Sequence, residues 1–96
     1  MSVIVIAQLS FTDVERYRAY QARFFDVFSK FKGRLLAADE APKLLEGDWF
    51  GDKVVLMAFP DESEADRFMS SPEYQKISVD RDAGASTVAL MVKALE

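Results

Sequence analysis

Three segments of the chain carry apolar residues at consecutive positions, so that both faces of an extended strand would be apolar. They are residues 2–10, 53–59 and 86–95. A strand with one solvated face alternates between apolar and polar residues, whereas a strand covered on both sides reads as a nearly continuous apolar run. The pattern therefore predicts three strands that are buried on both faces.

A helical period separates the first two of these strands. Between Asp13 and Phe31, aromatic residues recur at spacings of three and four, which is typical of an amphipathic helix with a buried aromatic face. Thr12 and Glu15 form the Thr-x-x-Glu pattern of a capping box, so we expect the helix to begin there. Gly33 is expected to end it in the left-handed conformation. The aromatic stripe consists of Tyr17, Tyr20, Phe24, Phe28 and Phe31.

The rest of the chain supplies a further strand and a second helical region. Residues 34–46 read as a strand with an irregular middle, because Pro42 cannot donate to a ladder. Residues 47–52 form a turn by composition. A short helix follows the third strand and restarts at Ser71, since Ser is a good N-cap and Pro72 suits the first helical position.

The resulting order is β-α-β-β-α-β, which predicts a ferredoxin-like α+β fold with two helices on one face of a four-stranded antiparallel sheet. A turn at residues 82–85 precedes the last strand. The length of 96 residues allows one domain, residues 1–96. Because the helices cover only one face, the apolar second face predicts a homodimer that pairs two sheets face to face, a dimeric α/β barrel.

Composition removes several classes of function. The formal charge of -4 argues against a nucleic-acid partner, because Lys and Arg supply most of that affinity. The chain has no cysteine and no histidine, which excludes thiolate chemistry and the commonest metal and haem ligands. We therefore expect no metal and no cofactor. No apolar stretch has the length of a membrane span, so we expect no membrane partner and a cytoplasmic location.

Six short motifs stand out within this layout: Asp13-Val14-Glu15-Arg16-Tyr17 with Tyr20, Gly33-Arg34, Glu46-Gly47-Asp48-Trp49, Phe59-Pro60, Ser71-Pro72-Glu73-Tyr74-Gln75 and Arg81. Together they resemble the DUF1330 family, a domain of unknown function in the dimeric α/β-barrel superfamily, over essentially the whole chain. The resemblance implies the ferredoxin-like fold and the face-to-face dimer but no established activity. Family members often carry an Arg and two glycines where this chain has Ala38-Asp39-Glu40, so an anion site that uses this Arg is not implied here.

Six residues are candidates for ligand binding. Trp49 lies in a turn beside two glycines, where it packs over one end of the barrel or against a partner subunit, or forms the wall of a ligand cleft. Tyr20, like Tyr17, is either an ordinary member of the buried stripe or directs its hydroxyl into a cleft. The candidates are Trp49, Arg81, Tyr20, Tyr74, Asp48 and Arg34.

Arg81 allows two interpretations. It shares a helix face with a tyrosine two turns earlier, and a guanidinium near the sheet needs an anionic partner. That partner is either a structural carboxylate, from Asp48, Glu46 or Glu73, or the carboxylate of a substrate. The loop carboxylates within residues 39–48 are likewise either solvated or a general acid and base pair.

Three functions are consistent with these observations. The first is binding of a small apolar or aromatic acid in a cleft between sheet and helices, with cofactor-independent oxygenation or isomerisation if the protein is an enzyme. The second is a non-catalytic ligand-binding or sensing module, and the third is a purely structural dimerisation unit. A cleft with Arg81 at its floor would favour the first two.

Overall fold

The computed structural model describes residues 1–95. Its element order is that expected from the sequence, with the second helical region divided into two helices. The elements are β1 (Val3–Phe11), α1 (Val14–Phe28), β2 (Arg34–Asp39), β3 (Lys53–Phe59), α2 (Glu62–Met69), α3 (Pro72–Gly84) and β4 (Ala85–Lys93). Among the described residues, no helix combines the length and the hydropathy needed to cross a bilayer.

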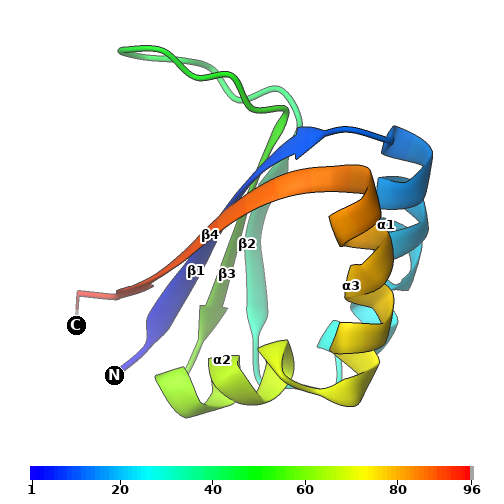
Figure 1. Cartoon of the computed structure of the whole chain (residues 1–96). Coiled ribbons are helices and arrows are strands. Elements are labelled where there is room, and N and C mark those ends of the chain that lie inside the picture. The colour runs from blue at the N-terminus through cyan, green and yellow to red at the C-terminus, as the bar shows by residue number, and fades with distance from the viewer. Residues whose placement is uncertain (96) are drawn as a thin grey trace.

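The four strands form one antiparallel sheet in the order β2-β3-β1-β4. In the central strand β1, Val5 pairs with Met57 of β3 on one side and with Met91 of β4 on the other. Figure 1 shows α1 and α3 beside each other on one face of the sheet, with α2 near one end of it. This arrangement is ferredoxin-like, so the fold predicted from the order of elements is confirmed.

The buried core lies between the helices and the sheet. Odd-numbered residues of β1 and β3 point towards the helices, because side chains alternate along a strand, and Val5 and Met57 are among them. Phe68 of α2 lies 5.3 Å from Phe28 of α1 and 5.7 Å from Phe59 of β3, measured between ring centroids. Aromatic pairs at these separations contribute beyond the area that they bury, so this cluster fixes both helices against the sheet.

The opposite face of the sheet has no helix over it and is called the open face. Its side chains are the alternate residues of each strand, and Leu90, midway along the edge strand β4, is 54% exposed. Burial of both faces, which the sequences predicted for three strands, is therefore not reached within one subunit: β1 and β3 are buried mainly on the helix side, and β4 is mostly exposed. The apolar residues of the open face are Ile4, Ile6, Ala37, Val54, Leu56, Ala58, Val88, Leu90 and Val92.

The start of α1 differs from the predicted capping box by one residue. The N-cap is Asp13, whose carboxylate accepts a hydrogen bond from the backbone N–H of Arg16. The Thr12 hydroxyl donates instead to the carbonyl oxygen of Ala83 near the end of α3. A tertiary contact has therefore replaced the local cap.

The end of α1 also corrects the sequence analysis. The helix stops at Phe28 rather than Phe31, and Gly33 is not left-handed, because among the described residues only Gly47 has a positive φ, of +78°. Gly33 is needed for space. A Cβ at this position would lie 2.7 Å from the Phe28 ring and 2.8 Å from the Phe59 ring, so the absence of a side chain lets the two rings pack against the backbone.

The second strand is shorter than the predicted segment 34–46. β2 ends at Asp39, before the irregularity expected around Pro42, and its pairing with β3 shifts register earlier, between Leu35 and Ala37. Residues 40–52 then leave the sheet as a projecting loop, which is called the arm (Figure 1). The predicted turn lies within the arm.

The turn predicted at residues 82–85 is instead the end of a helix that leads directly into β4. The carbonyl oxygen of Gly84 accepts hydrogen bonds from the backbone N–H groups of Thr12 and Asp13. A Cβ at Gly84 would lie 2.7 Å from the carbonyl oxygen of Asp13 and nearer still to the backbone nitrogen of Tyr17. Glycine is therefore required where α3 meets the start of α1.

Gly84→Ala is expected to reduce the free energy of unfolding by about 1–3 kcal/mol, because the added methyl group overlaps rigid backbone atoms. Urea denaturation followed by circular dichroism measures the loss. Ala83→Ser is the control, since it adds one heavy atom at the neighbouring exposed position of the same helix, and its loss should be smaller. Equal losses at the two positions would contradict the steric role of Gly84.

Candidate ligand-binding site

A cavity of about 280 Å³ opens between α1 and the strands β2 and β3. Its walls are mainly aromatic and aliphatic, and Lys53 is the charged residue among those that line it. Sites for small molecules typically combine apolar walls with a few polar groups in fixed positions. The lining residues are Tyr17, Tyr20, Gln21, Phe24, Phe25, Leu35, Ala38, Lys53 and Val55.

Lys53 gives this cavity a fixed positive charge. It is the first residue of β3, pairs with Leu9 of β1 and is 3% exposed. Its Nζ lies 4.9 Å from the centroid of the Tyr17 ring and 3.5 Å from Oε2 of Glu40. Removal of an ammonium from water costs several kcal/mol unless other groups compensate, and here the ring face and the carboxylate both do so.

The Glu40 carboxylate lies between the buried Lys53 and the half-exposed Arg18. Both of its oxygens accept hydrogen bonds from the Arg18 guanidinium, that to Oε1 being 2.6 Å long, in the two-pronged geometry that favours strong pairing. The hydrogen bonds from Arg18, assisted by the charge of Lys53, lower the pKa of Glu40 to about 2. Glu40 is therefore ionised at neutral pH and ties the base of the arm to α1 beside the cavity.

Tyr20 forms part of the inner wall and is linked to Arg81 through Tyr74. The Tyr20 and Tyr74 hydroxyl oxygens are 3.0 Å apart, and Arg81 donates to the Tyr74 hydroxyl at 2.8 Å. Burial, together with the neighbouring Tyr74, raises the pKa of Tyr20. Tyr20 therefore keeps its proton at neutral pH, so it can donate a hydrogen bond but cannot act as a general base.

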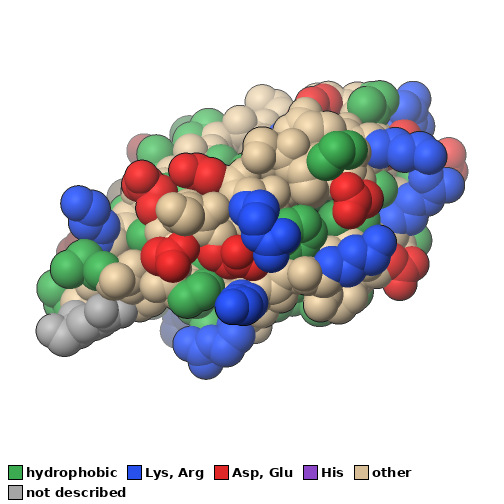
Figure 2. Space-filling view, turned by 90° about the horizontal axis from the view of Figure 1, so that it is seen from below, with side chains coloured by type: hydrophobic (Ala, Val, Ile, Leu, Met, Phe, Trp, Pro, Cys, Tyr) green, Lys and Arg blue, Asp and Glu red, His purple; other side chains and the backbone are tan. Residues whose placement is uncertain are grey.

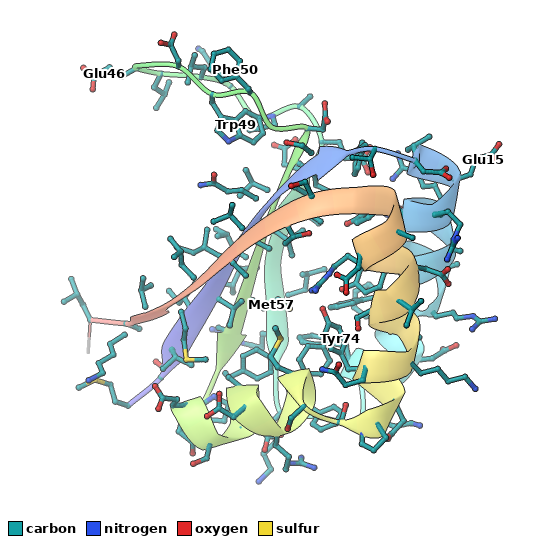
Figure 3. All side chains as sticks on the ribbon, viewed as in Figure 1. Glu15, Glu46, Trp49, Phe50, Met57 and Tyr74 are labelled. Carbon is teal, nitrogen blue, oxygen red and sulfur yellow. The ribbon has the colours of Figure 1, made fainter. Side chains whose placement is uncertain are left out.

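Arg81 makes none of the expected structural ion pairs. Its guanidinium binds the adjacent carboxylate of Asp82 at 3.0 Å, whereas Asp48 and Glu46 lie on the projecting arm (Figure 3), and Glu73 opens α3 more than two turns before Arg81. The hollow that Arg81 borders has a volume of only about 30 Å³, which is room for about one water molecule. The predicted cleft with Arg81 at its floor is therefore not the cleft that the structure contains.

The remaining sequence candidates lie outside this core. Figure 3 shows Trp49 on the arm, well separated from Tyr74, which lies between the sheet and the helices. The Trp49 ring packs over Gly51, where a Cβ would overlap the ring. The six candidates thus fall into two groups that share no cavity. Tyr20, Tyr74 and Arg81 lie on the helix side of the sheet, and Trp49, Asp48 and Arg34 lie on the arm or the open face.

Lys53 is the site residue that sequence reasoning missed. A lysine at the start of a strand is usually solvated, and nothing in its immediate neighbourhood indicates otherwise. The signal for its burial is its position in the alternation of the strand: Lys53 is on the core-facing side of β3, together with Met57 and Phe59. A cation on that side requires a cavity or a buried partner. Glu40, considered only as a loop carboxylate, supplies that partner.

The cavity offers one ammonium group, several aromatic faces and a protonated phenol. An ammonium attracts a carboxylate or phenolate through charge-assisted hydrogen bonds, and the ring faces favour an aromatic body. Within residues 1–95, no three His, Cys, Asp or Glu side chains come together as metal ligands. The arrangement is thus suited to an aromatic anion.

The strand order, the helices on one face and the aromatic cavity beneath α1 define a ferredoxin-like α+β protein. The chain belongs to the family described as a domain of unknown function, DUF1330, whose model matches residues 2–95. The family resemblance seen in the sequence motifs is thereby confirmed. Comparison with curated proteins gave no match.

Several solved structures have the same fold at low sequence identity. RPA0582 of Rhodopseudomonas palustris, of unknown function, has a TM-score of 0.83 and 18% identity, over 99% of this chain and 83% of that one. A dimeric ferredoxin-like protein of unknown function from Thermobifida fusca gives 0.74 and 13%, over 98% and 92%. SnoaB of Streptomyces nogalater, a cofactor-independent oxygenase, gives 0.72 and 14%, over 99% and 94%. At such identities the likeness shows the fold alone.

Glu40→Gln is expected to lower stability at neutral pH by about 1–2 kcal/mol, because solvent screens the partly exposed pair with Arg18, whereas the buried Lys53 ammonium loses its carboxylate partner. The lowered pKa of Glu40 means that its contribution is complete above its ordinary pKa of 4.5 and disappears as pH falls through about 2. The difference in melting temperature between wild type and variant should therefore shrink on acidification. A difference that stays constant from neutral pH to about pH 2 would contradict this role.

Proposed function

We propose that this protein is a homodimer in which each subunit binds a small aromatic anion in the cavity between α1 and the β2–β3 strands. The observation that carries the proposal is the ammonium group of Lys53, which is 3% exposed and lies in an aromatic cavity. A core position for lysine costs stability. Binding of a ligand anion explains why a lysine occupies this buried position.

The dimensions and walls of the cavity restrict the ligand. A volume of about 280 Å³ is at the lower end of the range for small-molecule sites, so a compact ligand is favoured. Tyr17 and Phe24 present ring surfaces from α1, and Val55 provides an aliphatic surface from β3. A single aromatic ring with one carboxylate or phenolate oxygen satisfies both the walls and Lys53.

Binding is better supported than catalysis. Proton abstraction needs a group whose pKa is close to the working pH, and the pKa of Tyr20 moves away from that range because of burial. SnoaB is described as a cofactor-independent oxygenase, and such chemistry would suit a protein without histidine, but an identity of 14% carries only the fold. A purely structural role is disfavoured because the cavity is not filled by the chain's own side chains.

Pairing of two sheets through their open faces is the proposed form of the dimer. Val88 and Leu90 are more than half exposed there, and contiguous apolar patches on soluble proteins usually mark association sites. The end of the molecule seen in Figure 2 has, by contrast, acidic and basic side chains interspersed over it. The ferredoxin-like protein from Thermobifida fusca is described as dimeric, which supports a homodimer here.

Lys53→Met is expected to weaken the binding of benzoate by at least about tenfold, because a charge-assisted hydrogen bond is lost. Binding of benzyl alcohol, a neutral analogue of similar shape, should change little. Isothermal titration measures both, and circular dichroism reports folding. Lys76→Met, at an exposed position of α3, is the control with the same change of charge, and it should behave as wild type. Equal weakening by the two variants would argue against an anion site at Lys53.

Ala38→Phe tests the location of the ligand independently of charge. Ala38 lines the cavity from β2, so a larger side chain there should occupy the space and abolish binding of both benzoate and benzyl alcohol. Chemical shift changes in a two-dimensional NMR titration provide the measurement, and the unliganded spectrum shows that the fold is kept. Retained binding of both compounds would place the ligand elsewhere.

A further inference from the structure

The arm, residues 40–52, carries large apolar side chains that the subunit itself does not cover. Phe50 is 90% exposed and Leu45 is 83% exposed, and Leu44 is also exposed. Single exposed apolar residues are ordinary, but several on one projecting loop form a patch that is typical of an interaction surface. The arm therefore has the composition of a contact element.

Hydrogen bonds hold the arm at both of its ends. At the end that enters β3, the Asp52 carboxylate accepts a hydrogen bond from the backbone N–H of Phe11 at 2.8 Å, and the Asp52 backbone N–H donates to the carbonyl oxygen of Leu9 at 2.7 Å. At the end that leaves β2, Glu40 pairs with Arg18. The direction in which the arm projects is therefore determined by the fold.

The arm projects on the same side of the sheet as the open face. A broad hollow of about 500 Å³ lies between arm residues 42–49 and two residues of the sheet, Gln8 and Val54, whose side chains belong to the open face. Figure 1 shows the arm at one end of the sheet, extending away from the helices. The arm and the open face are thus two walls of one concave surface.

The size of the open face bears on whether the arm takes part in the interface. Four strands of six to nine residues give a flat footprint of roughly 500 Å² per subunit, at about 4.8 Å between strands and 3.3 Å per residue. Stable interfaces of standard size bury about 800 Å² per partner. The accessible surface of the side chains exceeds this flat footprint, so the sheet face alone gives an interface of modest size, and the arm, which is continuous with it, adds area.

We infer that the arm is an intersubunit clasp, which packs Leu45 and Phe50 against a second copy of this chain seated on the open face. The inference rests on the proposed pairing through the sheet and adds the contact that completes it. A second copy fits because each copy brings one arm and one open face, so that a two-fold axis covers both arms in a single closed interface. Trp49, packed over Gly51, stiffens the arm rather than walling a ligand cleft.

Sedimentation equilibrium of a Leu45→Ser/Phe50→Ser double variant tests the clasp. Dimer dissociation should become at least about tenfold easier, because two large apolar side chains are lost from the interface. Val79→Ser is the matched control, since Val79 is 61% exposed on α3, away from the open face, and it should dissociate as wild type does. Leu90→Lys, on the open face beside Ile6 of the central strand β1, should yield monomers whatever the arm contributes.

The outcomes separate the clasp from the proposed dimer. A double variant that dimerises as wild type does, beside a monomeric Leu90→Lys, would overturn the clasp and leave the sheet pairing intact. A wild-type monomer at micromolar concentration would overturn both, and would leave the open face to another partner.

Direct contact is tested without relying on stability. A photoreactive benzoylphenylalanine at position 50 should crosslink light and heavy isotope-labelled copies to each other. Crosslinks confined to single chains would refute the clasp.

Discussion

The sheet carries apolar side chains on both faces, but the chain provides helices for only one of them. Much else in the structure follows from this constraint. On the covered side, aromatic residues of α1 and α2 close over Met57 and Phe59. On the other side, residues such as Leu90 have no cover within the chain, and the hydrophobic effect makes association the favourable outcome.

The cavity and the arm meet at one pair of charged residues. The arm leaves the sheet at Glu40 and returns to it at Lys53, so the same ion pair closes the base of a projecting loop and accompanies the cation of the cavity. Arg18 extends this pair to α1. The two features depend on each other, because the buried ammonium of Lys53 needs a compensating partner and that partner, Glu40, is the first residue of the arm. The proposed ligand site and the proposed intersubunit contact are therefore neighbours in the structure.

Strand periodicity, the order of elements and the apolar second face could all be inferred without coordinates, because each depends on residues close together in the sequence. Local signals failed where distant segments met. Gly33 resembles a helix terminator but accommodates the rings of Phe28 and Phe59. Two of the carboxylates considered as structural partners of Arg81 are on the arm, yet Arg81 binds Asp82 and a tyrosine hydroxyl, because the arm projects on the far side of the sheet.

The sequence by itself determined the ferredoxin-like order, the strands with two apolar faces and the helix faces, since alternation and helical spacing are properties of neighbouring residues. Only the tertiary structure decided where the cavity lies and which charged side chain lines it. Lys53 becomes a buried cation because β3 aligns with β1 in a register that turns it towards Tyr17 and away from solvent. Alternation along β3 puts Lys53 on the core-facing side, but only packing between segments far apart in the chain decides that a cavity and the Tyr17 ring lie there.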